Sequence, residues 1–82
     1  MRYQIDFLKS ALEQLRALPG EARRLIGAKL DRAQNDLTGD IKKLKGFKHK
    51  YRLRVGNYRV LFELEGACIV VYEVGDRKDI YE

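Results

Sequence analysis

Residues 51–64, "YRLRVGNYRVLFEL", alternate between apolar and polar positions as two half-buried β-strands do. Gly56-Asn57 interrupts the alternation and is typical of a two-residue hairpin turn. A turn of this length places Arg54 directly across from Arg59, on the same face of the hairpin as Arg52. Like charges opposite each other on neighbouring strands destabilise a sheet, so the pattern predicts an arginine face that serves something other than stability. The alternate positions on the opposite face, the apolar parity of the hairpin, are Tyr51, Leu53, Val55, Tyr58, Val60, Phe62 and Leu64.

The first half of the chain predicts one strand followed by two helices. Residues 2–7 alternate as a strand does, and residues 8–18 carry apolar side chains at helical spacing. Pro19-Gly20 ends that helix, a second begins near Glu21, and Gly39 is its expected C-terminal stop. The predicted buried stripe of the second helix consists of Leu25, Ile26, Leu30, Ala33 and Leu37.

The second half predicts a lysine-rich loop, the hairpin and a last strand. Residues 67–74, "ACIVVYEV", follow a tight turn at Glu65-Gly66, and their continuous apolar run predicts a central strand buried on both faces. The order strand–helix–helix–strand–strand–strand predicts one α+β domain over residues 1–82, with both helices on one face of a mainly antiparallel sheet and the other face exposed. If the last loop has two residues, Tyr72 shares the arginine face beside Arg59, whereas three residues reverse this.

The net charge of +5 is unevenly distributed along the 82 residues. Residues 1–40 have a net charge of +1, residues 41–60 have eight Lys/Arg and no acid, and residues 61–82 have −4. A basic block of this density is typical of a protein that binds a polyanion, although a solvated surface has the same composition. We expect its loop residues to follow RNA phosphates without sequence preference: Lys42, Lys43, Lys45, Lys48, His49 and Lys50.

Several classes of site are disfavoured by the residue content. One Cys and one His do not make a metal site, and no phosphate-binding glycine loop occurs, so we expect neither metal nor cofactor. Cys68 is expected as a buried, inert thiol of a reducing compartment, which argues against a catalytic pair with His49. No signal segment or membrane span is apparent, which predicts a cytoplasmic protein.

The segments "LKGFKHKYRLRVGNYRVLFEL" and "VGDRKDIY" resemble the RelE/ParE toxin superfamily, in particular RelE-type mRNA interferases. The resemblance implies a toxin of a type II toxin–antitoxin system, held inactive by a cognate antitoxin, that enters the ribosomal A site and cuts mRNA there. It implies a metal-independent endoribonuclease reaction in which the ribose 2′-OH attacks the adjacent phosphate. The family's catalytic positions fall on Arg52, Arg54, Arg59, Arg77 and Tyr81.

The chemistry of these side chains agrees with the resemblance except in proton transfer. Guanidinium groups match phosphate oxygens two at a time and can stabilise the charge of a phosphorane-like transition state. RelE-type relatives often carry lysine at the positions of Arg52 and Arg54, and many carry histidine where Asp76 stands. Arginine stays protonated and cannot act as a base, so Tyr81 or His49 is the expected proton carrier.

Two further readings use the same residues. A ParE-like protein would inhibit DNA gyrase by binding and cut nothing, and a non-catalytic module would only bind RNA or the ribosome. An antitoxin is expected to dock an acidic or amphipathic segment against residues 41–60. Each arginine could also be solvated or paired at the surface, and Tyr81 could simply cover the sheet edge.

Overall fold

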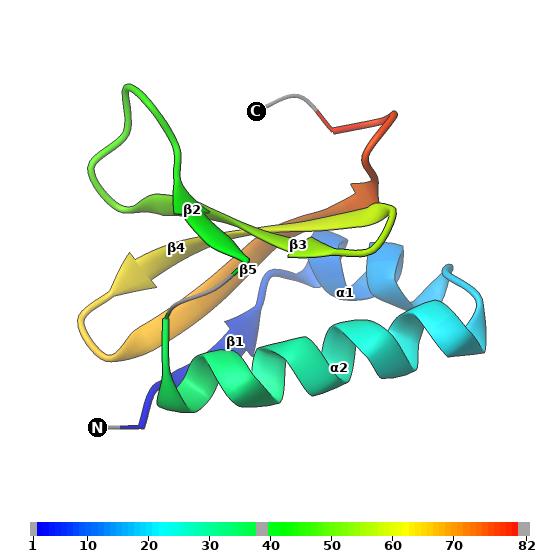
Figure 1. Cartoon of the computed structure of the whole chain (residues 1–82), viewed down its shortest axis with the longest axis horizontal. Helices are drawn as coiled ribbons and strands as arrows, with labels where there is room; N and C mark the ends of the chain where they lie inside the picture. Colours follow the sequence, from blue (N-terminus) through cyan, green and yellow to red (C-terminus); the bar gives the residue numbers. More distant parts are fainter. Residues whose placement is uncertain (1, 38–39, 81–82) are drawn as a thin grey trace.

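Within the described residues, 2–37 and 40–80 of a computed structural model, five strands form one sheet and two helices cover one face of it (Figure 1). The strand order is β1-β5-β4-β3-β2, in which β1 and β5 are parallel and every other neighbouring pair is antiparallel. The predicted α+β architecture is therefore confirmed. The elements are β1 (Gln4–Phe7), α1 (Lys9–Arg16), α2 (Gly20–Asn35), β2 (Ile41–Lys43), β3 (Lys50–Val55), β4 (Tyr58–Glu65) and β5 (Cys68–Asp76).

The β3–β4 hairpin has the predicted register, with Val55 opposite Tyr58 and Arg54 opposite Arg59. Gly56 occupies the first turn position with φ +57°, a left-handed conformation that glycine adopts at little cost. The β4–β5 turn also has two residues, but it lies one position later than predicted. Glu65 is the last residue of β4 and pairs with Cys68, so the turn residues are numbers 66 and 67.

The apolar parity of the hairpin faces the helices and forms the core, as predicted. Phe62 is completely buried and stacks on Tyr51 with ring centroids 5.5 Å apart. The buried cluster joins strands β3, β4 and β5 to both helices through Ala11, Ile26, Leu30, Ala33, Leu53, Val55, Val60, Phe62, Ile69, Val71 and Val74. This packing fixes the other parity, which carries the arginines, on the face away from the helices.

The helices differ from their predicted limits and stripe. Helix α2 begins at Gly20 and ends at Asn35, and the predicted stop at Gly39 lies outside the described residues. Leu25, predicted to be buried, is 50% exposed, and Ala22 is buried instead. The reason is helical geometry: Ala22, Ile26 and Leu30 lie four residues apart on one side of α2, and Leu25 lies beside that stripe. No helix among the described residues is long and apolar enough to cross a membrane.

Two strand predictions also need correction. Residues 41–43, predicted as loop, form the short edge strand β2, whose Lys42 pairs with Arg52. Strand β5 is central, between β1 and β4, but only one of its faces is buried. Ile69 and Val71 are fully buried, whereas Cys68 and Val70 on the outer face are only half-buried. The lone thiol is therefore outside the core, because its parity is that of the arginine face.

Candidate functional site

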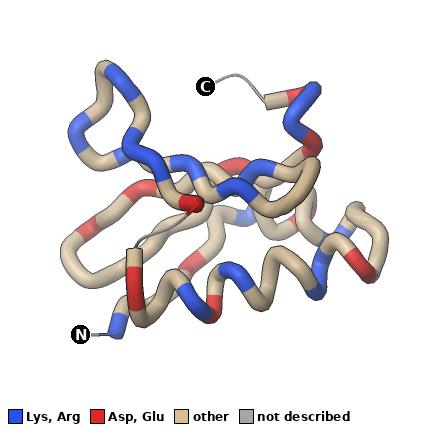
Figure 2. The backbone as a smooth tube through the Cα atoms, in the orientation of Figure 1, with Lys and Arg blue, Asp and Glu red and all other residues tan. Residues whose placement is uncertain are grey.

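The arginine face is the outer surface of β2, β3 and the first half of β4, on the side of the sheet opposite the helices. Figure 2 shows its basic residues along these strands. Arg54 stands directly across from Arg59, and the next outward position of β3, Arg52, stands between Lys42 on one side and Leu61 on the other. Residues 41–60, from which all four basic side chains come, include no Asp or Glu. Strand pairing thus brings together three of the predicted catalytic arginines and one predicted RNA-binding lysine.

The backbone around Arg54 fixes how close Arg54 and Arg59 come. The Arg54 N–H donates to the Asp40 carbonyl oxygen at 3.0 Å, on the side of β3 that faces β2. It therefore points away from β4, and Arg54 and Arg59 form a non-hydrogen-bonded pair. In such pairs the opposing side chains lie closest, with Cα atoms about 4.5 Å apart. The fold thus holds two guanidinium-bearing positions against each other at the geometry where their repulsion is greatest.

A hollow of about 310 Å³ opens at the β2 edge of this face, lined by Asp40, Ile41, Lys42, Arg52 and Arg54. The carboxylate of Asp40 forms a salt bridge with Lys29 of α2, with Nζ and Oδ2 2.6 Å apart. This hydrogen bond and the Lys29 charge lower the pKa of Asp40, so the carboxylate stays ionised at neutral pH. Asp40 thereby ties the start of β2 to α2, while the hollow keeps a mainly basic lining.

The C-terminal segment, residues 76–80, turns back toward the arginine face (Figure 1). Asp76 Oδ1 accepts the Lys78 N–H at 2.9 Å, a side-chain-to-backbone bond typical of turns. Arg77 donates its backbone N–H to the Asn57 carbonyl at 2.9 Å, which ties the segment to the β3–β4 turn. Arg77, an exposed residue, is therefore brought to the same end of the face as Arg59. Asp76 therefore helps to shape this turn.

Ile80 closes the segment over the sheet. Ile80 is only 8% exposed. Its side chain lies so close to Gly75 that a Cβ atom at position 75 would be 3.4 Å from Ile80 Cδ1. Gly75 pairs with Arg59, so Ile80 packs on the sheet next to that arginine. Leu61 is also buried on this face, which corrects the expectation that the whole face is exposed. Tyr81, the fifth predicted catalytic residue, lies outside the described residues.

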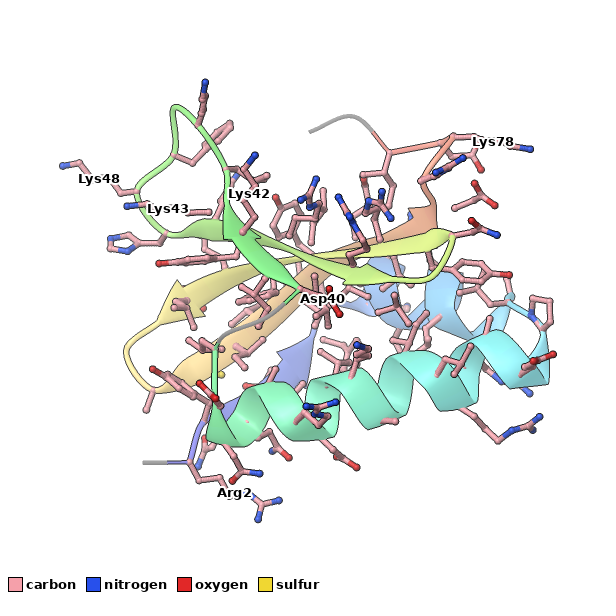
Figure 3. All side chains as sticks on the ribbon, in the orientation of Figure 1. Arg2, Asp40, Lys42, Lys43, Lys48 and Lys78 are labelled. Carbon is pink, nitrogen blue, oxygen red and sulfur yellow. The ribbon has the colours of Figure 1, made fainter. Side chains whose placement is uncertain are left out.

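The predicted RNA-binding residues are spread over β2 and the loop of residues 44–49. Lys42 lies over β2 and Lys48 projects from the loop, as Figure 3 shows. Lys43 and Lys45 are exposed, as is His49, which precedes β3 and accepts the Leu64 N–H through its carbonyl oxygen at 2.9 Å. Because side chains alternate along β3, His49 points to the side of the sheet opposite Arg52 and Arg54. The structure therefore does not bring His49 onto the arginine face.

Lys50 differs from the loop lysines because two aromatic rings hold it. Its Nζ lies 4.6 Å from the Phe47 ring centroid and 5.1 Å from that of Tyr72. Tyr72 shares the outer face, as a two-residue β4–β5 turn predicted. Because the turn lies one residue later than predicted, Tyr72 is displaced from Arg59, and it contacts Lys50 instead. Sequence reasoning missed Phe47, which its isolated position in a lysine-rich loop could have signalled.

The rest of the outer face is acidic, a division that the sequence reasoning did not predict. Glu63 pairs with Lys50, Glu73 pairs with Leu61, and Asp6 of β1 pairs with Val70. The net charge of −4 in residues 61–82 was the available signal. Burial, followed by the charges of Glu73 and Glu63, raises the pKa of Tyr72, so its hydroxyl stays protonated at neutral pH. Among the described residues of the outer face, the basic side chains thus lie on β2, β3, the loop of residues 44–49 and the start of β4, with Arg77 and Lys78 on the C-terminal segment.

Cys68 lies in this acidic half, where its Sγ donates to Asp6 Oδ2 at 3.3 Å. Burial and then the hydrogen bond to Asp6 raise the pKa of the thiol, which disfavours the nucleophilic thiolate. Among the residues that the structure describes, no group of three or more His, Cys, Asp or Glu side chains is arranged to hold a metal ion. The arginine face is therefore the chemically distinctive surface of this fold.

Comparison with known proteins assigns the class to which this fold and face belong. A family model described as the ParE toxin of the type II toxin–antitoxin system parDE matches residues 5–81. Toxin RelE3 of Methanocaldococcus jannaschii is 41% identical, with 96% of this chain and 96% of that protein covered. A putative RelE-like toxin protein of Escherichia coli is 30% identical, with coverage of 99% and 92%.

A solved structure gives the same result. The toxin chain in the RelB-RelE antitoxin-toxin complex from Methanococcus jannaschii is 39% identical and superposes with a TM-score of 0.79, covering 93% of this chain and 94% of that one. The chain therefore belongs to the RelE/ParE superfamily of type II toxin–antitoxin toxins and is RelE-like, as its sequence predicted.

Proposed function

We propose that this protein is a ribosome-dependent endoribonuclease that cuts mRNA in the A site. The observation that carries the proposal is the outward-facing pair Arg54–Arg59, flanked by Arg52, which the fold holds together despite the repulsion. An anion between these side chains would convert that repulsion into attraction, and arginine forks suit phosphate oxygens. The 39–41% identity to RelE toxins supports the same choice.

In the proposed reaction, the ribose 2′-oxygen forms a bond to the adjacent phosphorus and the bond from phosphorus to the 5′-oxygen breaks. The products are a 2′,3′-cyclic phosphate and a 5′-hydroxyl. Arg52, Arg54 and Arg59 would hold the scissile phosphate and stabilise the extra charge of the transition state, and Arg77 would add a fourth guanidinium. In-line positioning of the 2′-OH would supply much of the remaining acceleration.

The proton of the 2′-OH needs an acceptor that is not arginine, and the leaving 5′-oxygen needs a donor. We favour Tyr81 over His49 for one of these roles. Tyr81 follows Ile80, which packs against Gly75 beside Arg59, whereas His49 lies on the opposite parity of β3.

The proposed partners follow from the charge of the face. Lys42, Lys45 and Lys48 would follow mRNA and rRNA phosphates, and a cognate antitoxin would cover the arginine face with an acidic or amphipathic segment. The M. jannaschii relative was solved as a complex of RelE with the antitoxin RelB, which supports an antitoxin partner here.

The test is a ribosome complex with a defined A-site codon, in which mRNA 5′ ends are mapped by primer extension after the protein is added. We expect a cut within that codon that is absent without ribosomes. Arg24→Ala, at an exposed arginine of α2, serves as a charge-matched control for substitutions in the arginine face and should cut like the wild type. Intact mRNA from a protein that still arrests growth would refute the proposal.

A gyrase inhibitor is the second candidate, because the matching family model is that of ParE. A supercoiling assay with purified gyrase separates the two functions. Inhibition of supercoiling with intact A-site mRNA would establish the ParE-like activity. Uninhibited gyrase with cut mRNA would establish the nuclease. A protein that binds ribosomes but does neither would be a non-catalytic binding module.

A further inference from the structure

Phe47 is a large apolar side chain exposed within the basic surface. It lies in the loop of residues 44–49 between β2 and β3, where Gly46 adopts φ +83°, and its side chain is 50% exposed. Exposed lysines, Lys45 and Lys48, flank it in the sequence. A half-exposed phenylalanine outside the core contributes little to folding, and the cation placed over this ring is Lys50.

The ring is held in place from the sheet. Lys50, at the start of β3, places its ammonium 4.6 Å from the Phe47 centroid and 5.1 Å from the Tyr72 centroid, distances at which cation–π attraction operates. Tyr72 follows Cys68 and Val70 on the outer face of β5, and Glu63 stands across from Lys50. One ammonium thus links a loop ring to a strand ring, which reduces the freedom that Phe47 would lose on binding.

This aromatic pair lies in line with the arginine face. Along β3, Lys50, Arg52 and Arg54 occupy successive outward positions, and a strand rises about 3.3 Å per residue, so neighbouring members are about 7 Å apart. Figure 1 shows the loop of residues 44–49 rising from the sheet on the same side as the C-terminal segment, with the outer face of β3 and β4 between them. An RNA strand that runs along β3 with a phosphate on the arginines would therefore pass either the loop of residues 44–49 or the C-terminal segment.

We propose that Phe47, supported by Lys50 and Tyr72, is a stacking platform for a nucleobase of single-stranded RNA next to the scissile phosphate. The inference rests on the proposed function, because it takes the arginine face as the phosphate site. An exposed ring among phosphate-binding cations is the combination by which proteins hold unpaired bases without reading sequence. The basic residues around the loop suit RNA, because positively charged side chains neutralise a phosphate backbone.

The direct test uses a short single-stranded RNA that carries 2-aminopurine, whose fluorescence falls when the base stacks. Affinity and quenching are measured for the wild type, Phe47→Ala and Phe47→Trp. Leu25→Ala is the matched control, because Leu25 is also 50% exposed but lies on α2, on the other side of the sheet. Phe47→Ala should bind about tenfold more weakly and lose most of the quenching, whereas Phe47→Trp and Leu25→Ala should bind like the wild type. Equal affinity and quenching for Phe47→Ala would overturn the platform.

The same variants separate this inference from the proposed function. RNA that binds and quenches on the wild type, with A-site mRNA left intact, would refute the nuclease and keep the platform. Cutting by the wild type, with Phe47→Ala equal to it in both binding and cutting, would refute the platform and keep the nuclease. The salt dependence adds a readout that a structural defect would not imitate: Phe47→Ala should lower affinity without changing the slope of log K against log salt, whereas Lys42→Gln should reduce that slope.

Discussion

Replacing Arg59 with alanine separates a functional arginine from a structural one. Arg54 and Arg59 form a non-hydrogen-bonded cross-strand pair. If their guanidinium groups are about 7 Å apart in water, they repel by about 0.6 kcal/mol. Arg59 also donates from Nη1 to the Tyr58 carbonyl at 3.1 Å and, at the longer distance of 3.5 Å, to the Gly56 carbonyl. A hydrogen bond of this kind contributes about 1 kcal/mol net. The substitution removes both effects, which oppose each other, so the free energy of unfolding should change by less than about 1 kcal/mol.

The activity should respond very differently. Loss of one preorganised donor to a transition-state oxyanion costs about a hundredfold to a thousandfold in rate. We therefore expect Arg59→Ala to unfold in urea close to the wild-type midpoint and to cut A-site mRNA at least about a hundredfold more slowly. Arg59→Lys should recover only part of the rate, because lysine keeps the charge and loses the planar fork. Cutting by Arg59→Ala at the wild-type rate would refute the active-site assignment. Destabilisation by more than about 2 kcal/mol would make the residue structural.

Three further predictions concern the fold and its ionisable groups. Phe62→Ala empties the centre of the core and should lower the free energy of unfolding by about 3–5 kcal/mol in urea titrations; a loss below about 1 kcal/mol would contradict the assigned core. The Cβ of Gly56→Ala would meet no atom within 4 Å, so this variant should lower the free energy of unfolding only through its left-handed φ, by about 1–2 kcal/mol. Gly27→Ala, within α2, should instead raise the free energy of unfolding by about 0.5–1 kcal/mol. Equal effects at the two positions would contradict the turn geometry. The pKa of the Cys68 thiol is raised, so this thiol should be alkylated slowly at pH 8. Asp6→Asn should speed the alkylation, because it removes the carboxylate that disfavours the thiolate. An unchanged alkylation rate would exclude the Asp6 contact.

The fold was largely predictable because its pattern is local. Strict alternation in residues 51–64 and a glycine at the turn set the hairpin register, including the Arg54–Arg59 pair. Strand β2 was not predictable, since its three residues are mostly polar and pair with β3 only because the loop returns to that edge. The half-exposed outer face of β5 was missed for a related reason: Val70 is apolar, but no described helix covers its side of the sheet as α1 and α2 cover the other.

The site was predictable in part, and the limit was long-range geometry. The three hairpin arginines follow from periodicity alone. The approach of Arg77 depends on a backbone hydrogen bond to Asn57 and on Ile80 packing over Gly75, neither of which has a local sequence signal. The contact of Lys50 with Tyr72 depends on where the β4–β5 turn lies, and the sequence pattern placed that turn one residue too early.

The most direct test of the central claim is to replace the ribose 2′-OH at the cut site. An A-site mRNA with a single 2′-deoxynucleotide on the 5′ side of the scissile phosphate is compared with the all-ribose mRNA, and the product ends are identified by mass spectrometry. We predict that the all-ribose mRNA yields a 2′,3′-cyclic phosphate and a 5′-hydroxyl and that the deoxy mRNA stays intact. Cutting of the deoxy mRNA, or products that end in a 3′-hydroxyl and a 5′-phosphate, would contradict an arginine-held phosphate attacked by its own 2′-OH.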